Sequence, residues 1–140
     1  TLMEDMAIVI NTGDSPVYHY RAGEGDLYLE SHIMNKAEAD ASRGKYEKET
    51  EDYYQNTHIL LSYLGKREDL SEREISLRYI YRIAPGDKLI LGTDGAFGET
   101  KKEQICQMAR EENGQGLIMR LFETARDTDD DDQTAILLEF

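Results

Sequence analysis

The chain has 140 residues, of which 39% are hydrophobic and 32% are charged, and its formal net charge is −13. This length is sufficient for one domain with a hydrophobic core. The acidic balance argues against sequence-independent nucleic-acid binding, which depends on clustered Lys and Arg, and against docking on an anionic membrane surface. No segment is long and apolar enough for a membrane span, and a single cysteine, Cys106, excludes an intrachain disulfide. We therefore expect a cytoplasmic, reducing environment.

The first thirty residues predict three short strands. Residues 6–10 form an apolar run that indicates a buried strand, and residues 11–16 have the composition of a tight turn. Alternation over Val17–Arg21 indicates a second strand, and residues 27–29 a third. Because the connections are short, we expect the three strands to form an antiparallel meander. Strand-like sequence starts almost at the first residue, so we also expect the chain to begin inside a domain.

The centre of the chain has a weaker pattern. Residues 34–54 are polar and rich in Lys, Glu and Ala, and they predict a helix followed by an exposed loop. Residues 58–64 form an apolar patch that Gly65 closes, and residues 66–74 are expected to be a charged loop. Alternation over residues 77–83 predicts a further strand.

The last third of the chain predicts a strand, two helices and a closing strand. Residues 88–92 form the first of these, a buried strand. The first helix is expected to start with a capping box formed by Thr100 and Glu103 and to stop at Gly114. The second helix has an apolar stripe on one face. Residues 134–140 are predicted to be the closing strand.

Three acidic sites lie at the ends of predicted strands. Asp14 follows the first strand, Asp94 follows residues 88–92, and Asp131 precedes the closing strand. A carboxylate there is fixed by the sheet and points into the cleft that the loops form. Mg²⁺ and Mn²⁺ prefer such oxygen ligands, and a bound ion lowers the pKa of its water and shields phosphate charge. Taken singly, each site is typical of an ordinary turn or a solvated acidic loop.

Other chemical motifs are weaker. His19, His32 and His58 do not have the spacing of metal ligands, and Cys106 has no neighbouring histidine in the sequence. No segment matches the phosphate-cradling pattern Gly-x-x-x-x-Gly-Lys-Ser/Thr.

Three motifs, in order, resemble those of the metal-dependent protein phosphatase 2C (PPM-type) family. Residues 9–21, Val-Ile-Asn-Thr-Gly-Asp-Ser-Pro-Val-Tyr-His-Tyr-Arg, resemble its strand pair xxNxGDSRxYxxR. Residues 85–95, Pro-Gly-Asp-Lys-Leu-Ile-Leu-Gly-Thr-Asp-Gly, resemble PGDxLLLxSDG. Residues 131–138, Asp-Asp-Gln-Thr-Ala-Ile-Leu-Leu, resemble the closing DNxTxxxV. Residues 56–65 resemble the N-x-x-x-x-x-x-G stretch usually found between them, so the likeness spans essentially the whole chain.

The resemblance implies an α+β fold, a two-layer antiparallel β-sandwich flanked by helices, which is incomplete here. Residues 1–140 would be the C-terminal portion of the domain. The implied activity is that of a phosphoserine/phosphothreonine protein phosphatase, in which a metal-activated water hydrolyses the phosphoester at a binuclear Mn²⁺ or Mg²⁺ centre. Asp94 and Asp131 match ligands of the second metal, and Asp14 matches the aspartate associated with a weakly held third metal. The implied partner is a phosphoprotein substrate.

The chain also departs from the family pattern. The first half of the family domain is absent, with its Asp-Gly-His-Gly-Gly motif, which supplies the aspartate that bridges both metals, and with the basic residue that holds the substrate phosphate. Gly98 stands where the family often has an acid, and residues 36–55 are unusually polar. Three interpretations stay open at this point. The chain is a piece of an active phosphatase whose N-terminal part is its partner, it is a catalytically inactive binding or regulatory module, or it is an unrelated acidic β-rich domain.

Overall fold

The computed structural model describes residues 2–3, 5–48, 50–65, 75–98, 100–126 and 131–140. In chain order its elements are β1 (Leu2–Met3), β2 (Met6–Asn11), β3 (Val17–Arg21), β4 (Asp26–Leu29), α1 (Lys36–Ser42), α2 (Glu51–Tyr54), β5 (Ser76–Tyr81), β6 (Lys88–Gly92), α3 (Asp94–Phe97), α4 (Lys102–Glu111), α5 (Gly114–Arg126) and β7 (Ala135–Glu139). None of the described helices is long and apolar enough to cross a membrane.

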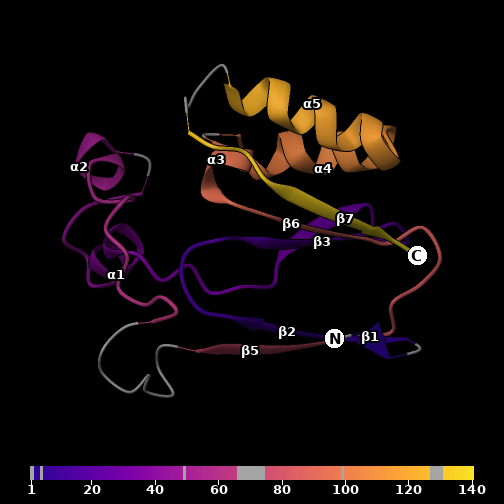
Figure 1. Cartoon of the computed structure of the whole chain (residues 1–140), viewed down its shortest axis with the longest axis horizontal. Helices are drawn as coiled ribbons and strands as arrows, with labels where there is room; N and C mark the ends of the chain where they lie inside the picture. The colour runs from indigo at the N-terminus through magenta and orange to yellow at the C-terminus, as the bar shows by residue number, and fades with distance from the viewer. Residues whose placement is uncertain (1, 4, 49, 66–74, 99, 127–130) are drawn as a thin grey trace.

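The strands form two antiparallel sheets that face each other, with α4 and α5 over the outer face of one of them (Figure 1). One sheet has the order β1-β2-β5 and the other has the order β4-β3-β6-β7. The larger core lies between the second sheet and the two helices, and its fully buried aliphatic side chains are Leu27, Ile90, Ile105, Leu117 and Leu121. The predicted fold class, a two-layer antiparallel sandwich flanked by helices, is confirmed.

The predicted meander of the first three strands is wrong. β3 and β4 pair with each other, but β2 pairs with β1 and β5 in the opposite sheet. The connection after β2 is a crossing between sheets instead of a hairpin turn. In it Asn11 Nδ2 donates to Ser15 O at 3.2 Å, and Gly92 N of β6 donates to Pro16 O at 3.3 Å. An alternating pattern indicates which side chains share a face, but it does not identify the neighbouring strand.

The predicted capping box of Thr100 and Glu103 is also wrong, because α4 begins two residues later than Thr100. The N–H of Lys101 donates to Gln104 Oε1 at 3.0 Å, so Gln104 supplies the side chain that caps this helix start. α4 ends at Glu111, three residues before the predicted stop at Gly114. Gly114 is instead the first residue of α5, and its φ of 52° is a left-handed conformation that favours glycine.

Two short helices occupy the polar segment that predicted one helix and a loop. α1 is capped by the side chain of Asn35 and α2 by that of Thr50. They lie beside one end of the sandwich (Figure 1). The apolar residues 58–64 contact this lobe through an antiparallel bridge between Leu60 and Asn35, in which Lys36 N donates to Ile59 O at 2.8 Å. The charged loop predicted for residues 66–74 lies outside the described residues.

Candidate metal centre

Asp14 lies in the crossing between the two sheets. The preceding Gly13 has a φ of 102°, which only glycine adopts without strain, and its carbonyl accepts from Met34 N at 3.0 Å. Thr12 and Ser62 join their hydroxyl groups at 2.7 Å on the other side of Gly13. The backbone around Asp14 is therefore fixed by contacts with two later parts of the chain, at Met34 and at Ser62.

Asp94 is the first residue of α3, directly after β6. The sheet fixes the position of its backbone, and its side chain is exposed at the sheet edge. Thr93, the residue before it, is bonded to the segment that carries Asp131. Thr93 N donates to Thr134 O at 3.0 Å, and Thr93 Oγ1 donates to Asp132 O at 3.1 Å. Two segments that are far apart in the sequence are thus joined beside the two carboxylates.

Gly95 explains how closely Asp131 approaches α3. A Cβ atom at Gly95 would lie 2.7 Å from Asp132 O and 3.0 Å from Asp131 Cβ. A real Cβ atom essentially never makes a contact as short as the first of these, so glycine after Asp94 is required by this approach. The predicted Asp94 and Asp131 are thereby brought together.

Electrostatics connect Asp14 to the other two carboxylates. Burial raises the pKa of Asp14 most, and the negative charges of Asp94 and Asp131 raise it further. Among the described residues no lysine or arginine forms an ion pair with any of the three. The site therefore concentrates negative charge that a cation would neutralise.

Asp14 and Asp94 line one cleft of about 420 Å³. Its wall includes Tyr18 and Phe97, and the lobe of α1 and α2 contributes Glu38, Tyr53 and Tyr54. The sequence did not predict the contribution of this lobe. Its helices are short and have no apolar periodicity, so no local signal indicated that they face the acidic site.

The described carboxylates fit a divalent cation in type but do not complete its coordination. Carboxylate oxygens are the ligands that Mg²⁺ and Mn²⁺ prefer. Yet among the described residues no group of three or more His, Cys, Asp or Glu side chains is arranged to hold a metal ion. The three aspartates therefore supply part of a ligand set, and their role as ligands stays a prediction.

Solved structures match the fold over nearly the whole chain, whereas no protein-family model and no curated protein matches it. The serine/threonine phosphatase of S. agalactiae is 17% identical with a TM-score of 0.80, over 99% of this chain and 56% of that one. The PPM Ser-Thr phosphatase MsPP from Mycobacterium smegmatis, in complex with cacodylate, is 25% identical with a TM-score of 0.66, over 93% of this chain and 53% of that one. The catalytic domain of the phosphatase PstP, in complex with two manganese ions, is 18% identical with a TM-score of 0.73, over 97% of this chain and 54% of that one.

These matches agree with the three motifs and with the two-sheet topology. The chain has the fold of part of the PPM-type, phosphatase 2C-like serine/threonine phosphatases, and it spans about half the length of the structures that it matches.

Proposed function

We propose that the chain is the later part of a metal-dependent phosphoserine/phosphothreonine protein phosphatase domain, in which Asp94 and Asp131 hold Mn²⁺ or Mg²⁺ and Asp14 adds a third carboxylate. One observation carries the proposal. Three carboxylates from separate segments lie within electrostatic reach of one another beside a cleft, and no described cation offsets them. The manganese ions in the PstP structure support the choice of metal. The single thiol, Cys106, supports a cytoplasmic enzyme.

The reaction would consume water and a phosphoester and release inorganic phosphate and the serine or threonine hydroxyl. A bound divalent ion supplies positive charge that shields the phosphate and lowers the pKa of water. The protein residues would bind the ions and fix the positions of the segments that carry the ligands. The three aspartates provide oxygen ligands, while Thr93 keeps the Asp131 segment against α3 through its bonds to Asp132 and Thr134.

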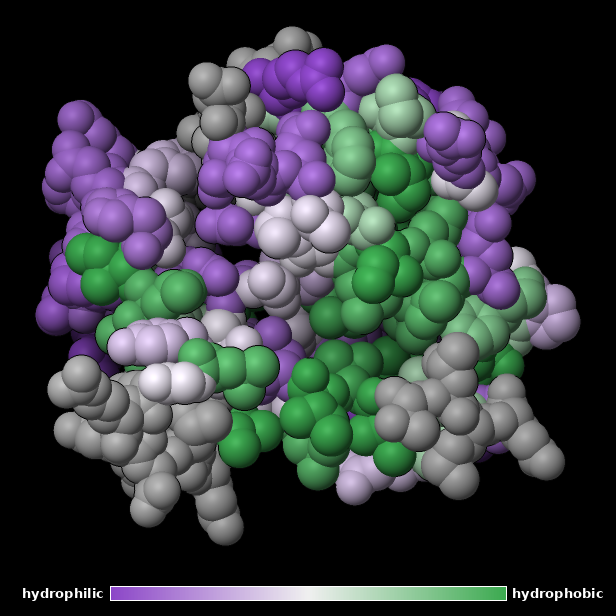
Figure 2. Space-filling model, viewed as in Figure 1, coloured by the Kyte–Doolittle hydropathy of each residue, from purple (hydrophilic) through white to green (hydrophobic). Residues whose placement is uncertain are grey.

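A second half of the domain is part of the proposal, and one face of the chain supports it. In the β1-β2-β5 sheet, paired residues that alternate with the buried Ala7 and Ile80 all point away from the other sheet. They are all large and apolar: Met6, Ile8, Ile10, Leu77, Tyr79 and Tyr81. Among the described elements no helix covers this face, and Figure 2 shows hydrophobic side chains where β2 and β5 lie. The matched phosphatases are about twice as long, so we propose that the rest of the domain packs here.

The test is hydrolysis of p-nitrophenyl phosphate by a polypeptide that joins this chain to the rest of its domain, with and without Mn²⁺. Turnover that requires Mn²⁺ and is lost in Asp94→Asn is the expected result. An Asp26→Asn variant, which changes an exposed aspartate outside the cleft, serves as the control and should retain turnover. A folded wild-type protein that hydrolyses no phosphoester in Mn²⁺ would refute the proposal.

A catalytically inactive binding or regulatory module is the alternative, and Gly98 favours it. Gly98 has a φ of 52° and ends α3, and its N–H donates to Asp94 O at 2.8 Å. A left-handed backbone favours glycine there, so the acid that the family often has at this position is absent for a local structural reason. If the enzyme is active, its remaining metal ligands must therefore come from residues other than Gly98. The hydrolysis experiment decides between the enzyme and the inactive module.

A further inference from the structure

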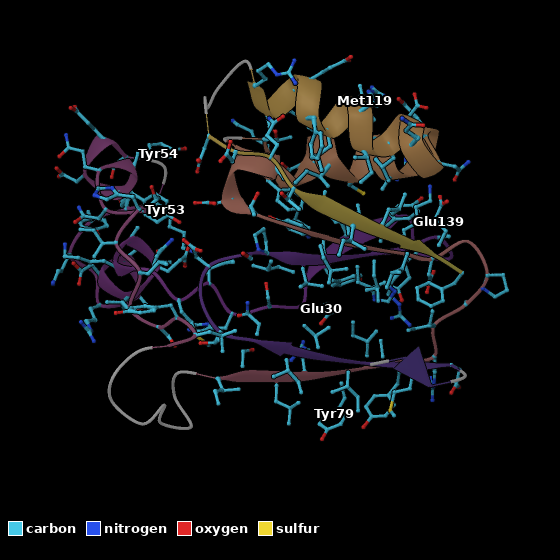
Figure 3. All side chains as sticks on the ribbon, in the orientation of Figure 1. Glu30, Tyr53, Tyr54, Tyr79, Met119 and Glu139 are labelled. Carbon is cyan, nitrogen blue, oxygen red and sulfur yellow. The ribbon has the colours of Figure 1, made fainter. Side chains whose placement is uncertain are left out.

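The cleft that holds Asp14 and Asp94 has a second, aromatic part that phosphate chemistry does not require. The lining residues of the cleft include four aromatic rings and three aliphatic side chains, namely Tyr18, Tyr53, Tyr54, Phe97, Pro16, Leu29 and Ile33. The rings form two pairs. Tyr18 and Phe97 meet edge to face at 5.1 Å between centroids, and Tyr53 and Tyr54 do so at 5.7 Å. Figure 3 shows Tyr53 and Tyr54 on the lobe beside the end of the sandwich.

Hydrogen bonds hold Tyr53 in place. Its hydroxyl donates to Glu38 Oε1 of α1 at 2.5 Å, and Lys48 donates to the other oxygen of Glu38 at 2.7 Å. Together with burial, Glu38 raises the pKa of Tyr53 to a value well above its usual 10. The tyrosine therefore stays neutral at physiological pH. A neutral ring with a fixed hydroxyl is an apolar surface of defined position, and fixing it in advance lowers the entropic cost of binding.

The charges that line this cleft are all of one sign. Asp14, Asp94 and Glu38 are its carboxylates, and the described lining residues include no lysine or arginine. With the proposed metal ions bound, the aspartates would be neutralised, and Glu38 is already paired with Lys48, which does not line the cleft. An acidic group on a ligand would therefore meet no lysine or arginine among the lining residues. An aromatic or aliphatic group would bury apolar surface against the rings.

We propose that this aromatic subsite, formed by Tyr18, Tyr53, Tyr54 and Phe97, binds the side chain next to the phosphorylated residue of a peptide substrate, and that it selects aromatic or aliphatic side chains over acidic ones. The inference rests on the proposed function, because that function brings a phosphopeptide to the adjacent carboxylates. It adds a substrate class to that function, and it assigns a role to the lobe of α1 and α2.

The test is the affinity of fluorescent peptides that carry a non-hydrolysable difluoromethylene phosphonate in place of phosphothreonine, measured by anisotropy in Mn²⁺. The protein is the polypeptide that joins this chain to the rest of its domain. Three peptides differ only at the residues flanking the phosphonate, which are Phe, Ala or Glu. Partial burial of a ring predicts about tenfold tighter binding of the Phe peptide than of the Ala peptide, and the Glu peptide should bind most weakly.

Variants assign the preference to the subsite. Tyr53→Ala and the exposed Tyr54→Ala should reduce the Phe-to-Ala affinity ratio toward one, whereas Tyr53→Phe, which keeps the ring, should preserve it. Tyr28→Ala is the matched control, because Tyr28 also donates to a glutamate, Glu24 at 2.6 Å, but lies outside the cleft. A ratio of one in the wild-type protein, or a ratio that survives both alanine variants, would overturn the inference.

Hydrolysis of p-nitrophenyl phosphate by the same preparations separates this inference from the proposed function. Turnover together with a ratio of one would refute the subsite and leave the phosphatase intact. A ratio of about ten without turnover would establish the subsite in a binding module and refute the enzyme.

Discussion

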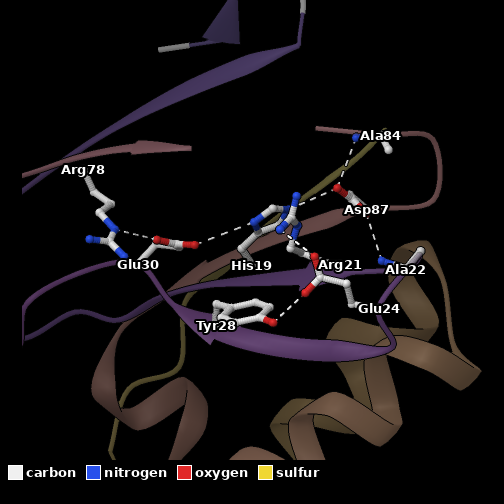
Figure 4. A network of polar contacts seen from close by, with 9 residues as sticks. All are labelled: His19, Arg21, Ala22, Glu24, Tyr28, Glu30, Arg78, Ala84 and Asp87. Carbon is white, nitrogen blue, oxygen red and sulfur yellow. Dashed lines mark hydrogen bonds and ion pairs between the residues drawn. The ribbon is translucent and has the colours of Figure 1, made fainter. Parts of the chain in front are cut away.

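His19 of β3 and Asp87, the residue before β6, are 68 positions apart in the sequence, and their side chains meet between the two sheets with 3.3 Å between His19 Nε2 and Asp87 Oδ2 (Figure 4). On the other side of the ring, His19 Nδ1 lies 3.7 Å from Glu30 Oε1. Glu30 accepts in turn from Arg78 Nε of β5 at 3.0 Å. A polar chain thus runs from one sheet to the other through a buried histidine.

Asp87→Ala is expected to destabilise the protein strongly. Besides His19, the Asp87 carboxylate accepts from Ala22 N at 2.9 Å and from Ala84 N at 3.1 Å. Its removal leaves the buried His19 and two partly buried backbone donors without their acceptor, and we expect a loss of roughly 2–4 kcal/mol in the free energy of unfolding, measured by urea denaturation. Asp26→Ala, which removes an exposed carboxylate that accepts from Leu27 N and lies 3.6 Å from the ammonium group of Lys102, is the control. Equal losses in the two variants would contradict the role given to Asp87.

Glu30 should make stability depend on acid pH. Its contact with His19, followed by the hydrogen bond from Arg78, lowers the pKa of Glu30 below its usual 4.5. The unfolded chain therefore takes up this proton at a higher pH than the folded protein does. The stabilisation by Glu30 is complete above pH 4.5 and is lost as the pH falls through the lower pKa of the folded state.

Glu30→Gln should flatten this part of the stability profile. We expect the free energy of unfolding of the variant to fall less steeply than that of the wild type between pH 4.5 and the acid transition, as measured by urea denaturation at each pH. Glu103→Gln, an exposed substitution on α4, should keep the wild-type slope. Parallel profiles of wild type and Glu30→Gln would show that the acid sensitivity lies elsewhere.

Much of this fold was predictable because local sequence patterns indicate individual strands. Strands β3, β5, β6 and β7 were found from alternation or apolar runs, and the sandwich was implied by the resemblance of three motifs to the phosphatase 2C family. The strands that pair with β2 were not predicted, because alternation does not indicate which strands are neighbours. The buried contact of His19 and Asp87 was also missed. Each residue is polar and locally unremarkable, and only the register of β3 against β6 brings them together.

The residues of the candidate site were also predictable only in part. Asp14, Asp94 and Asp131 were predicted from motifs with fixed spacing, and they approach one another across the chain. Tyr53 and Glu38 were not predicted as site residues, since they come from short capped helices whose position depends on tertiary contacts. One of these is the hydrogen bond from Lys36 N to Ile59 O at 2.8 Å. The sequence therefore indicated the acidic residues of the cleft, but not the residues of α1 and α2 that form its other wall.

Lys88→Met should weaken the attachment of α4 to the sheet. Lys88 is buried, and its ammonium group donates to Ala109 O at 2.6 Å and to Glu112 O at 2.5 Å, over the ring of Tyr20. Burial lowers the pKa of Lys88. Methionine fills the volume but leaves both carbonyls at the helix end without this donor, so we expect a loss of roughly 1–3 kcal/mol in urea denaturation.

The matched control is Lys102→Met. Lys102 also lies over a tyrosine ring, 5.7 Å from the centroid of Tyr28, but its side chain is half exposed and it forms no comparable pair of bonds to a helix end. We expect a change below about 0.5 kcal/mol there. A Lys88→Met protein as stable as Lys102→Met would show that these two bonds do not hold α4.

Asp14→Asn should raise the thermal stability of the metal-free protein and reduce the stability that the protein gains from Mn²⁺. Burial and the charges of Asp94 and Asp131 raise the pKa of Asp14, so the ionised carboxylate is disfavoured in the folded state at neutral pH. Removing the charge should raise the midpoint of thermal unfolding in EDTA, and the gain should vanish at acid pH, where Asp14 is already protonated. With Mn²⁺, the variant should gain less stability than the wild type. A lower midpoint in EDTA would contradict the charge argument.

Gly95→Ala tests whether the close approach of Asp131 matters for metal binding. The new Cβ would lie 2.7 Å from Asp132 O and 3.0 Å from Asp131 Cβ, so the segment that carries Asp131 must move. Because metal ligands tolerate displacements of only a few tenths of an ångström, we expect at least about tenfold weaker Mn²⁺ binding by calorimetry. Gly23→Ala is the matched control, since a Cβ at Gly23 meets nothing within 4 Å. Unchanged Mn²⁺ affinity in a folded Gly95→Ala protein would exclude Asp131 from the metal site.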